Sequence, residues 1–278
     1  MRTHHHADFA PTGRASGVSV VIPARDEAAT IGPIVATCAP LVGQVLVVDA
    51  ASGDGTAEVA ARAGAEVVQE SELLPQFGPA LGKGDAMWRA LSAVRGDVVL
   101  YLDADTERFG EHFVRGMIGP LLTEPAVQFV KGFYRRPFKL GGAVQEEGGG
   151  RVTELTAKPL LREFYPELAA LHQPLAGEIA ARRVLLERLP FCTGYAVETA
   201  MVIDAWSEVG IDAMAQVDLD VRQNRHQPLS ALRPMADAVL GAVADRLVRE
   251  GRLAGDAGHV TERPPLRELA SSARRGAP

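Results

Sequence analysis

Four short apolar runs in the N-terminal part of the chain alternate with segments of helical pattern. The runs occupy 18–22, 44–48, 66–69 and 97–102, and their lengths and β-branched content are typical of buried strands. Helical patterns follow the first three runs, at 28–32, 56–62 and 84–94. Strands that alternate with helices predict βαβ crossovers, so we expect an α/β fold with a mostly parallel central sheet flanked by helices.

Acidic side chains follow the ends of three of these runs. The first run leads into Pro23 and on to Glu27, the second ends at Asp49, and the fourth ends at Asp103 and Asp105. Ligands of parallel α/β sheets bind beyond the carboxyl ends of the strands, so we expect these residues to share one crevice. Asp103 and Asp105 point the same way if the extended backbone continues. Mg²⁺ and Mn²⁺ prefer carboxylate and phosphate oxygens, so the pair predicts a cation site for a nucleotide diphosphate.

A basic, glycine-rich segment lies between residues 131 and 158. Within it, 148–150 are three glycines, Arg151 follows them, and Thr153 lies two residues further on. A guanidinium fork, a backbone N–H and a hydroxyl group can together bind a phosphate or a carboxylate. The alternative is a solvated loop with scattered charges. We expect Arg151 to bind an anion.

Composition and charge exclude several classes of protein. With 278 residues, ordinary apolar content and a net charge of −6, the chain is not expected to bind nucleic acid. No apolar stretch approaches the ~20 residues of a membrane span. Cys38 and Cys192 lie far apart in apolar surroundings, which favours buried thiols in a reducing cytoplasm. His4, His5 and His6 fall in a polar leader, and we expect neither a tag nor a metal site there.

Several motifs resemble those of GT-A glycosyltransferases. The residues of 21–27, of 47–56 and of Asp103-Ala104-Asp105 resemble the nucleotide-sugar-binding half of that fold. Further motifs are similar to those of one branch, the glucosyl-3-phosphoglycerate synthases and related mannosyl-3-phosphoglycerate synthases of actinobacteria. These motifs occupy 79–89, 130–137, 148–155, 173–178 and 194–198. The resemblance extends from residue 17 to residue 245.

This resemblance implies a GT-A fold and a metal-dependent, retaining hexosyltransferase. It implies UDP-glucose or a related sugar nucleotide as donor, 3-phosphoglycerate as an anionic small-molecule acceptor, and Mg²⁺ or Mn²⁺ as cofactor. On this basis, the donor is expected to contact Pro23, Ala24, Arg25, Glu27, Asp49, Lys83, Asp103 and Ala104. The acceptor is expected at Gly150, Arg151, Thr153, Asn224 and His226, catalytic roles at Asp105, Glu198 and Arg222, and the metal at Asp105 and His226.

One segment departs from the family pattern. Members typically read Val-Arg-x-His-Arg-Asn near the end of the catalytic region, and that histidine is a metal ligand. This chain reads Val221-Arg222-Gln223-Asn224-Arg225-His226, so asparagine and histidine have exchanged places. Either Asn224 binds the cation weakly, or His226 takes over as the ligand. The exchange also leaves the identity of the acceptor open.

The same patterns predict how the chain is divided. We expect a flexible leader (1–16), a GT-A catalytic domain (17–215) with a donor half (17–125) and an acceptor half (126–215), a metal and acceptor segment with a C-terminal helix (216–254), and a flexible tail (255–278). Apolar residues from Leu229 to Leu247 recur at helical spacing. They predict an amphipathic helix that packs on the catalytic domain or across the interface of a homodimer.

Three other functions remain open at this point. A nucleotidyltransferase would have a glycine-rich basic loop after the first strand, where this chain has Pro23 to Glu27. A relative that glycosylates a different phosphorylated or carboxylated acceptor is favoured by the exchanged Asn224 and His226. A non-catalytic sugar-nucleotide-binding protein would need a defective metal site, whereas this chain retains both aspartates of the pair.

Overall fold

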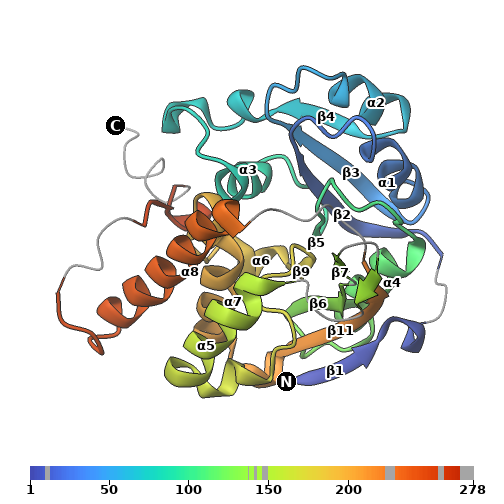
Figure 1. The fold of residues 1–278 in the computed structure, drawn as a ribbon. Helices are drawn as coiled ribbons and strands as arrows, with labels where there is room; N and C mark the ends of the chain where they lie inside the picture. Colours follow the sequence, from blue (N-terminus) through green and yellow to red (C-terminus); the bar gives the residue numbers. More distant parts are fainter. Residues whose placement is uncertain are drawn as a thin grey trace.

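The computed structural model describes residues 1–9, 13–136, 138–140, 143–145, 150–222, 229–255 and 260–269. An eight-stranded sheet lies at its centre, with the strand order β1-β11-β6-β9-β5-β2-β3-β4 (Figure 1). Its strands are β1 (Arg2–His5), β2 (Ala15–Ala24), β3 (Val42–Asp49), β4 (Glu66–Gln69), β5 (Val98–Tyr101), β6 (Phe129–Arg135), β9 (Ile179–Arg182) and β11 (Met214–Val221). β9 runs antiparallel to both neighbours, and the other pairs of this sheet are parallel. The predicted α/β fold is confirmed.

Helices cover both faces of this sheet (Figure 1). They are α1 (Ile31–Cys38), α2 (Thr56–Arg62), α3 (Lys83–Ala90), α4 (Glu111–Thr123), α5 (Lys158–Phe164), α6 (Arg183–Leu186), α7 (Val197–Val209) and α8 (Leu229–Arg249). Successive side chains of β2 point to opposite faces. Val20 and Ile22 therefore pack into one core with α1 and α4, whereas Val21 packs into a second core with α3 and α7.

Smaller elements complete the described chain. A 3₁₀ turn, η1 (His6–Asp8), follows β1 directly. β7 (Phe138–Leu140) pairs with β8 (Ala143–Gln145), and β10 (Phe191–Cys192) pairs with β12 (Glu262–Arg263), both antiparallel.

The strands and helices predicted for the N-terminal part agree with the structure, except that the first helix begins later than predicted. β2 to β5 fall on the four apolar runs, and α2 and α3 begin at or next to their predicted first residues. α1 begins only at Ile31, so Asp26 and Glu27 lie in the preceding turn, outside the helix. The Asp26 carboxylate accepts a hydrogen bond from the Gly53 N–H (2.9 Å), and the Ser52 hydroxyl accepts one from the Asp26 N–H (2.9 Å). These bonds join the turns after β2 and β3, which form one wall of the crevice described below.

The first residues of the chain belong to the sheet, although the sequence predicts a flexible leader over 1–16. β1 pairs in parallel with β11 and forms one edge of the sheet. Its polar side chains have partners that are distant in sequence: His4 contacts Glu124 (3.2 Å), and His6 contacts Asp220 (2.6 Å). A hydrophobicity pattern cannot show such polar pairs, so the leader prediction was wrong for this part of the chain.

Part of the predicted tail, 255–278, is also packed against the catalytic domain. The Arg263 guanidinium donates to both carboxylate oxygens of Asp85 (2.7 and 2.8 Å), and the Trp88 indole N–H donates to the Pro264 carbonyl (2.8 Å). Both partners lie on α3. The described end of the chain therefore supports the helix that begins at Lys83.

The predicted amphipathic helix is confirmed as α8. Its Val239, Val243 and Leu247 are buried, whereas Leu229 and Leu240 are exposed. Figure 1 shows α8 beside α7, on the opposite side of the molecule from α1 and α2. Among the described residues, no helix combines the length and hydropathy that a bilayer crossing requires.

Both cysteines are buried free thiols, as the sequence predicts; Cys38 lies in apolar surroundings, whereas charged groups approach Cys192. Cys38 is fully buried, and burial raises the pKa of its thiol to about 12. Cys192 is fully buried as well, and its thiol contacts Glu262 (3.0 Å) and Arg246 (3.3 Å). Neither thiol is poised to react as a thiolate near neutral pH.

Candidate active site

A cavity of about 430 Å³ opens where β2, β3 and β5 end. Because parallel strands present their carboxyl ends at one edge, the residues that follow them meet here. The predicted site residues that line this main cavity are Pro23, Ala24, Arg25, Glu27, Lys83, Asp103, Ala104 and Asp105. Glu70 and Tyr195 line it too, and the sequence analysis did not single them out. The expectation of one shared crevice is therefore confirmed for most of the donor set.

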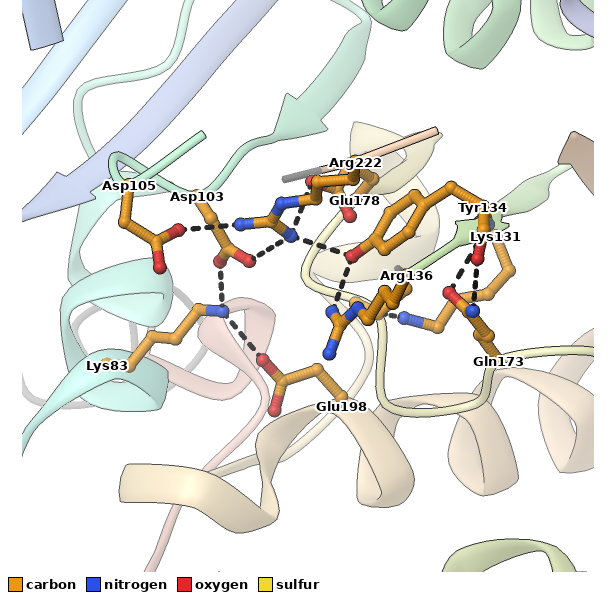
Figure 2. Close-up of polar contacts among 11 residues, drawn as sticks. Lys83, Asp103, Asp105, Lys131, Tyr134, Arg136, Gln173, Glu178, Glu198 and Arg222 are labelled. Atoms are coloured by element: carbon orange, nitrogen blue, oxygen red, sulfur yellow. Dashed lines mark hydrogen bonds and ion pairs between the residues drawn. The ribbon is translucent and has the colours of Figure 1, made fainter. Parts of the chain in front are cut away.

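Lys83 joins two carboxylates from separate elements at the rim of the cavity (Figure 2). It is the first residue of α3, and its ammonium group donates to Asp103 (2.5 Å) and to Glu198 at the start of α7 (2.7 Å). Burial alone lowers the pKa of Lys83, but the two nearby negative charges outweigh burial and raise it. Lys83 is therefore charged at neutral pH, and Glu198 has the hydrogen-bonding partner that its burial predicts.

Arg222 connects the paired aspartates to two further residues. Its Nη1 donates to Asp103 (2.8 Å), to Glu178 (2.9 Å) and to the Tyr134 hydroxyl (2.7 Å), and its Nη2 donates to Asp105 (2.6 Å). The Arg222 side chain is only 1% exposed. Figure 2 shows the guanidinium between the two aspartates and the tyrosine. We call Lys83, Asp103, Asp105, Glu178, Glu198 and Arg222 the ionic network.

The two aspartates have different environments within this network. Lys83 occupies one oxygen of Asp103 and Arg222 the other, so Asp103 is saturated by cationic side chains. Arg222 contacts a single oxygen of Asp105, and the Asp105 side chain is 43% exposed at the cavity. No described residue pairs with the second oxygen. Asp105 therefore fits a role as ligand of a hard divalent cation, and Asp103 fits a positioning role.

Gly177 provides the space that Asp103 needs. A Cβ atom at this position would lie 2.2 Å from both carboxylate oxygens of Asp103. The neighbouring Glu178 belongs to the motif 173–178 of the sequence analysis, and its buried carboxylate accepts from Arg222 (2.9 Å). The side-chain amide of Gln173, from the same motif, forms two hydrogen bonds with the backbone of Tyr134. Its oxygen accepts from the Tyr134 N–H, and its nitrogen donates to the Tyr134 carbonyl. The motif 173–178 therefore shapes the ionic network from the side of β6 and β9.

Asp49 lies beneath the main cavity and does not line it. It is buried, and one of its oxygens accepts from the Ser52 N–H (3.1 Å) and from the Gln69 side chain (3.0 Å). Its other oxygen is buried without a hydrogen-bond partner among the described residues. A buried acceptor of this kind suits a hydrogen-bond donor of a bound ligand.

Gly150, Arg151 and Thr153, the predicted acceptor residues that the structure describes, do not line the main cavity. Arg151 lines a second cavity of about 410 Å³, which it shares with Leu229 and Arg233 from the start of α8. Gly150 has a left-handed backbone (φ 73°), and Thr153 is buried. Asn224 and His226 lie outside the described residues, so their predicted roles stay untested.

Arg136 is a cation that the sequence analysis noted only as one of several scattered charges. Its guanidinium lies over the Tyr134 ring, 5.0 Å from the centroid, and donates to the Tyr134 hydroxyl (2.7 Å). Its Nε is buried without a hydrogen-bond partner among the described residues. Lys131, from the same basic segment, is buried and donates to the Ala176 carbonyl instead, and burial lowers its pKa to about 8. Arg136 is thus the better placed of the two for an anion.

Asp103→Asn is expected to reduce the loss of folding stability that the protein undergoes as the pH falls into the acid range. Burial raises the pKa of Asp103, but the charges of Lys83 and Arg222 outweigh it and lower this pKa below its ordinary value. The folded chain therefore binds this proton more weakly than the unfolded chain, whose carboxyl group has a pKa of about 3.9. The stabilisation is complete above that pH and is lost as the pH falls through it towards the folded pKa.

Urea unfolding from about pH 6 down to about pH 3 measures this effect, since the slope of stability against pH reports the difference in bound protons. The wild type should lose more stability over this interval than Asp103→Asn. Identical slopes would show that Asp103 is not held ionised by its neighbours. Asp97→Asn is a matched control, because Asp97 is 91% exposed.

The fold and the main cavity together define a class of protein. A mostly parallel sheet covered on both faces binds its ligand beyond the strand ends. Here Lys83, Asp103 and Asp105 meet at that edge, and one carboxylate oxygen of Asp105 has no partner among the described residues. This arrangement suits a nucleotide diphosphate and a divalent cation. The arrangement is that of a nucleotide-sugar transferase.

Comparison with known proteins identifies the family. The family "Glycosyl transferase family 2" matches residues 19–179. A glucosyl-3-phosphoglycerate synthase from Mycolicibacterium smegmatis is 43% identical over 244 residues, which cover 86% of this chain and 80% of that protein. The chain therefore belongs to glycosyl transferase family 2.

Solved structures agree over nearly the whole chain. The mannosyl-3-phosphoglycerate synthase of Rubrobacter xylanophilus is 47% identical and has a TM-score of 0.88, covering 96% of this chain and 97% of that one. The glucosyl-3-phosphoglycerate synthase of Mycobacterium tuberculosis, in complex with Mn²⁺, UDP-glucose and phosphoglyceric acid, is 38% identical with a TM-score of 0.83 and covers 97% and 99%. The same enzyme is also known in complex with Mg²⁺ and UDP.

Proposed function

We propose that this protein transfers glucose from UDP-glucose to 3-phosphoglycerate, with retention at the anomeric carbon and with Mg²⁺ or Mn²⁺ as cofactor. One observation is central to the proposal. Arg222 and Lys83 hold the paired aspartates so that Asp105 alone keeps an oxygen available at the main cavity. The complexes of the M. tuberculosis relative with Mn²⁺, UDP-glucose and phosphoglyceric acid support the choice of substrates.

The donor would lie across the ends of β2, β3 and β5. The oxygen of Asp49 that has no partner would accept a hydrogen bond from the N–H of a uracil ring. This ring would lie beside Val48 and Ala50, which line the cavity. Asp105 would hold the cation, and this cation would neutralise the charge that develops on the departing diphosphate. A further protein ligand, Asn224 or His226, remains a prediction on residues outside the described part.

The ionic network would position the sugar end of the donor. Glu198 keeps one carboxylate oxygen on Lys83, and its second oxygen can accept a hydrogen bond from a sugar hydroxyl. Arg222 fixes the Asp105 side chain and balances its negative charge from the buried side. The bond from the anomeric carbon to the diphosphate would break, the acceptor oxygen would bond to that carbon on the same face of the sugar, and the proton of the acceptor hydroxyl would pass to the departing diphosphate.

The acceptor would bind through two cationic groups that do not line the main cavity, Arg151 and Arg136. Gly150, Arg151 and Thr153 combine a left-handed glycine, a guanidinium and a hydroxyl group, which suits a phosphate. Arg136 adds a partly buried guanidinium that donates to the Tyr134 hydroxyl (Figure 2). A molecule with a phosphate at one end and a carboxylate at the other suits two such cations.

A second candidate differs in the donor sugar. The R. xylanophilus structure is that of a mannosyl-3-phosphoglycerate synthase and is 47% identical to this chain. A third candidate uses another phosphorylated or carboxylated acceptor, which the exchange of Asn224 and His226 favours. A non-catalytic sugar-nucleotide-binding protein is disfavoured, since Asp103 and Asp105 are both present and both positioned.

Activity with a panel of substrates tests these candidates. The purified chain is incubated with Mg²⁺ and either UDP-glucose or GDP-mannose, each with 3-phosphoglycerate, glycerol 3-phosphate or no acceptor. Our proposal predicts the fastest release of nucleotide diphosphate with UDP-glucose and 3-phosphoglycerate together. Faster turnover with GDP-mannose would favour the mannosyl donor, and acceptor-independent release alone would contradict the proposed transfer.

We also propose a homodimer in the cytoplasm. The exposed Leu229 and Leu240 on α8 are candidates for the contact between copies. The two buried free thiols suit a reducing compartment. Light scattering of the purified chain measures its mass directly, and a monomer would exclude the dimer.

Arg151→Ala is expected to raise KM for the acceptor by tenfold or more and to leave the affinity for UDP-glucose unchanged, because a guanidinium fork on an anion is removed. Steady-state kinetics with varied 3-phosphoglycerate and calorimetry with UDP-glucose alone give the two values. Lys158→Ala is the matched control, since Lys158 lies in the same segment but pairs with Glu154 (2.5 Å). An equal loss of UDP-glucose affinity would move Arg151 into the donor site.

A further inference from the structure

Two histidines and an aspartate meet at the edge of the sheet formed by β1 and β11. His5 is the last residue of β1, His6 begins the 3₁₀ turn η1, and Asp220 lies near the end of β11. The proposed transfer reaction uses none of these side chains. The sequence predicts no metal site at the N-terminal histidines, because they fall in a polar leader. Their partner carboxylate, Asp220, lies more than two hundred positions away.

The three side chains converge on one point. His6 Nε2 lies 2.6 Å from one oxygen of Asp220, and His5 Nε2 lies 3.2 Å from the other. One ligand atom from each residue can be chosen so that all three lie within 4.8 Å of one another. His6 is 20% exposed, and His5 and Asp220 are 44% and 46% exposed. The cluster is therefore preformed and accessible from solvent.

We propose that His5, His6 and Asp220 form a binding site for one divalent transition-metal ion of the Zn²⁺ type. Two imidazole nitrogens and one carboxylate oxygen, with water in a fourth position, are a common ligand set for zinc. Mg²⁺ prefers oxygen ligands, so this site differs in chemistry from the one at Asp105. The inference does not depend on the proposed glycosyl transfer.

Binding of a metal ion requires a change of tautomer at His5. The Ala7 N–H donates to His5 Nδ1 (3.2 Å), so in the metal-free form His5 Nε2 bears the proton and faces Asp220. Binding through Nε2 requires the other tautomer, with the proton on Nδ1, and the Ala7 hydrogen bond is then lost. A metal–nitrogen bond replaces that single, long hydrogen bond.

Two further side chains lie next to the cluster: His112 beside His6, and Arg135 beside Asp220. The His112 ring lies 4.9 Å from the His6 ring, and His112 is hydrogen-bonded to the backbone of Leu219. Arg135 approaches Asp220 to 3.9 Å, but its side chain is 68% exposed and is free to turn into solvent.

A metal ion here would join the N-terminal strand to the segment that holds Arg222. Asp220 lies two residues before Arg222, whose guanidinium orders the aspartate pair. A cross-link between β1 and the end of β11 lowers the freedom of the sheet edge. We therefore expect the metal to raise the melting temperature of the chain, because a ligand that binds only the folded state stabilises it.

Calorimetric titration of the metal-free full chain with Zn²⁺, without nucleotide, tests the proposal. The wild type should bind one equivalent at this site and melt at a higher temperature with Zn²⁺ than with a chelator. His5→Gln/His6→Gln and Asp220→Asn should each weaken binding by about a hundredfold. His4→Gln is the matched control: it lies on the same strand, but its ring contacts Glu124 (3.2 Å), and this variant should bind as the wild type does. Asp105→Ala should also retain the site.

Equal Zn²⁺ affinity in the wild type and His5→Gln/His6→Gln, or no Zn²⁺ binding by the wild type, would overturn the proposal. In the second case the cluster is held by hydrogen bonds alone. A Co²⁺ titration of the wild type keeps the test independent of variant folding. Four-coordinate nitrogen and oxygen ligation should give an intense visible absorption, and a weak spectrum like that of hydrated Co²⁺ would contradict the ligand set.

Discussion

Asp105→Ala is expected to lower kcat by at least about a hundredfold, which corresponds to roughly 2.7 kcal/mol of lost transition-state stabilisation. Of Asp103 and Asp105, only Asp105 has a carboxylate oxygen that the ionic network leaves available to a metal ion at the cavity. Loss of a cation that neutralises a leaving group removes several kcal/mol. Initial rates with UDP-glucose and 3-phosphoglycerate at saturating Mg²⁺ give kcat.

The fold should tolerate this change, because the Asp105 side chain is 43% exposed. Thermal melting of the same preparation serves as the control and should shift little. Asp105→Asn keeps the shape and the contact to Arg222 but lacks the charge, so it should be nearly as inactive. A variant that keeps more than about a tenth of the wild-type rate would show that another residue is the principal metal ligand.

Arg222→Ala is expected to reduce both stability and activity. The guanidinium is buried and contacts Asp103, Asp105 and Glu178, so its removal leaves carboxylates without their counter-charge. Removing one partner of a buried ionic group destabilises a protein by about 3–5 kcal/mol. Urea unfolding measures the stability, and kcat should fall as well because Asp105 loses its fixed orientation.

Two further variants separate charge from shape at this position. Arg222→Lys retains the positive charge but lacks the guanidinium fork that reaches Asp103 through Nη1 and Asp105 through Nη2, so it should recover stability in part and activity less. Tyr134→Phe removes the hydroxyl that accepts from Arg222 (2.7 Å) and from Arg136 (2.7 Å) but keeps every charge of the ionic network, so it should destabilise the protein less than Arg222→Ala does. If Arg222→Ala were no less stable than Tyr134→Phe, the ionic network would not hold the site together.

The donor side of the site could be predicted because it depends on local rules. The apolar runs fix the strands, and parallel strands place their final residues at one edge, so Pro23 and Asp103 had to meet there. This expectation needed no information on distant contacts. Strand alternation predicted that Asp103 and Asp105 lie together only if the extended backbone continued, but β5 ends at Tyr101 and Asp105 lies in a turn. Arg222 contacts both carboxylates and joins them.

The remaining features depend on contacts between residues that are far apart in the sequence. Arg222 and Asp103 are separated by more than a hundred positions, and no periodicity links Glu178 to either of them. The histidines at the start of the chain appeared solvated because their partner, Asp220, lies on β11. Paired charges can be located only once the order of the strands is known.

The reaction product tests the central claim most directly. The chain is incubated with UDP-glucose, 3-phosphoglycerate and Mg²⁺, and the product is examined by proton NMR and mass spectrometry, with Asp105→Ala in parallel. We predict one equivalent of UDP for each glucosyl-3-phosphoglycerate formed, with the glucose still in the α configuration of the donor and no product from the variant. A β-linked product, or UDP release without glucosylated phosphoglycerate, would contradict the proposed retaining transfer.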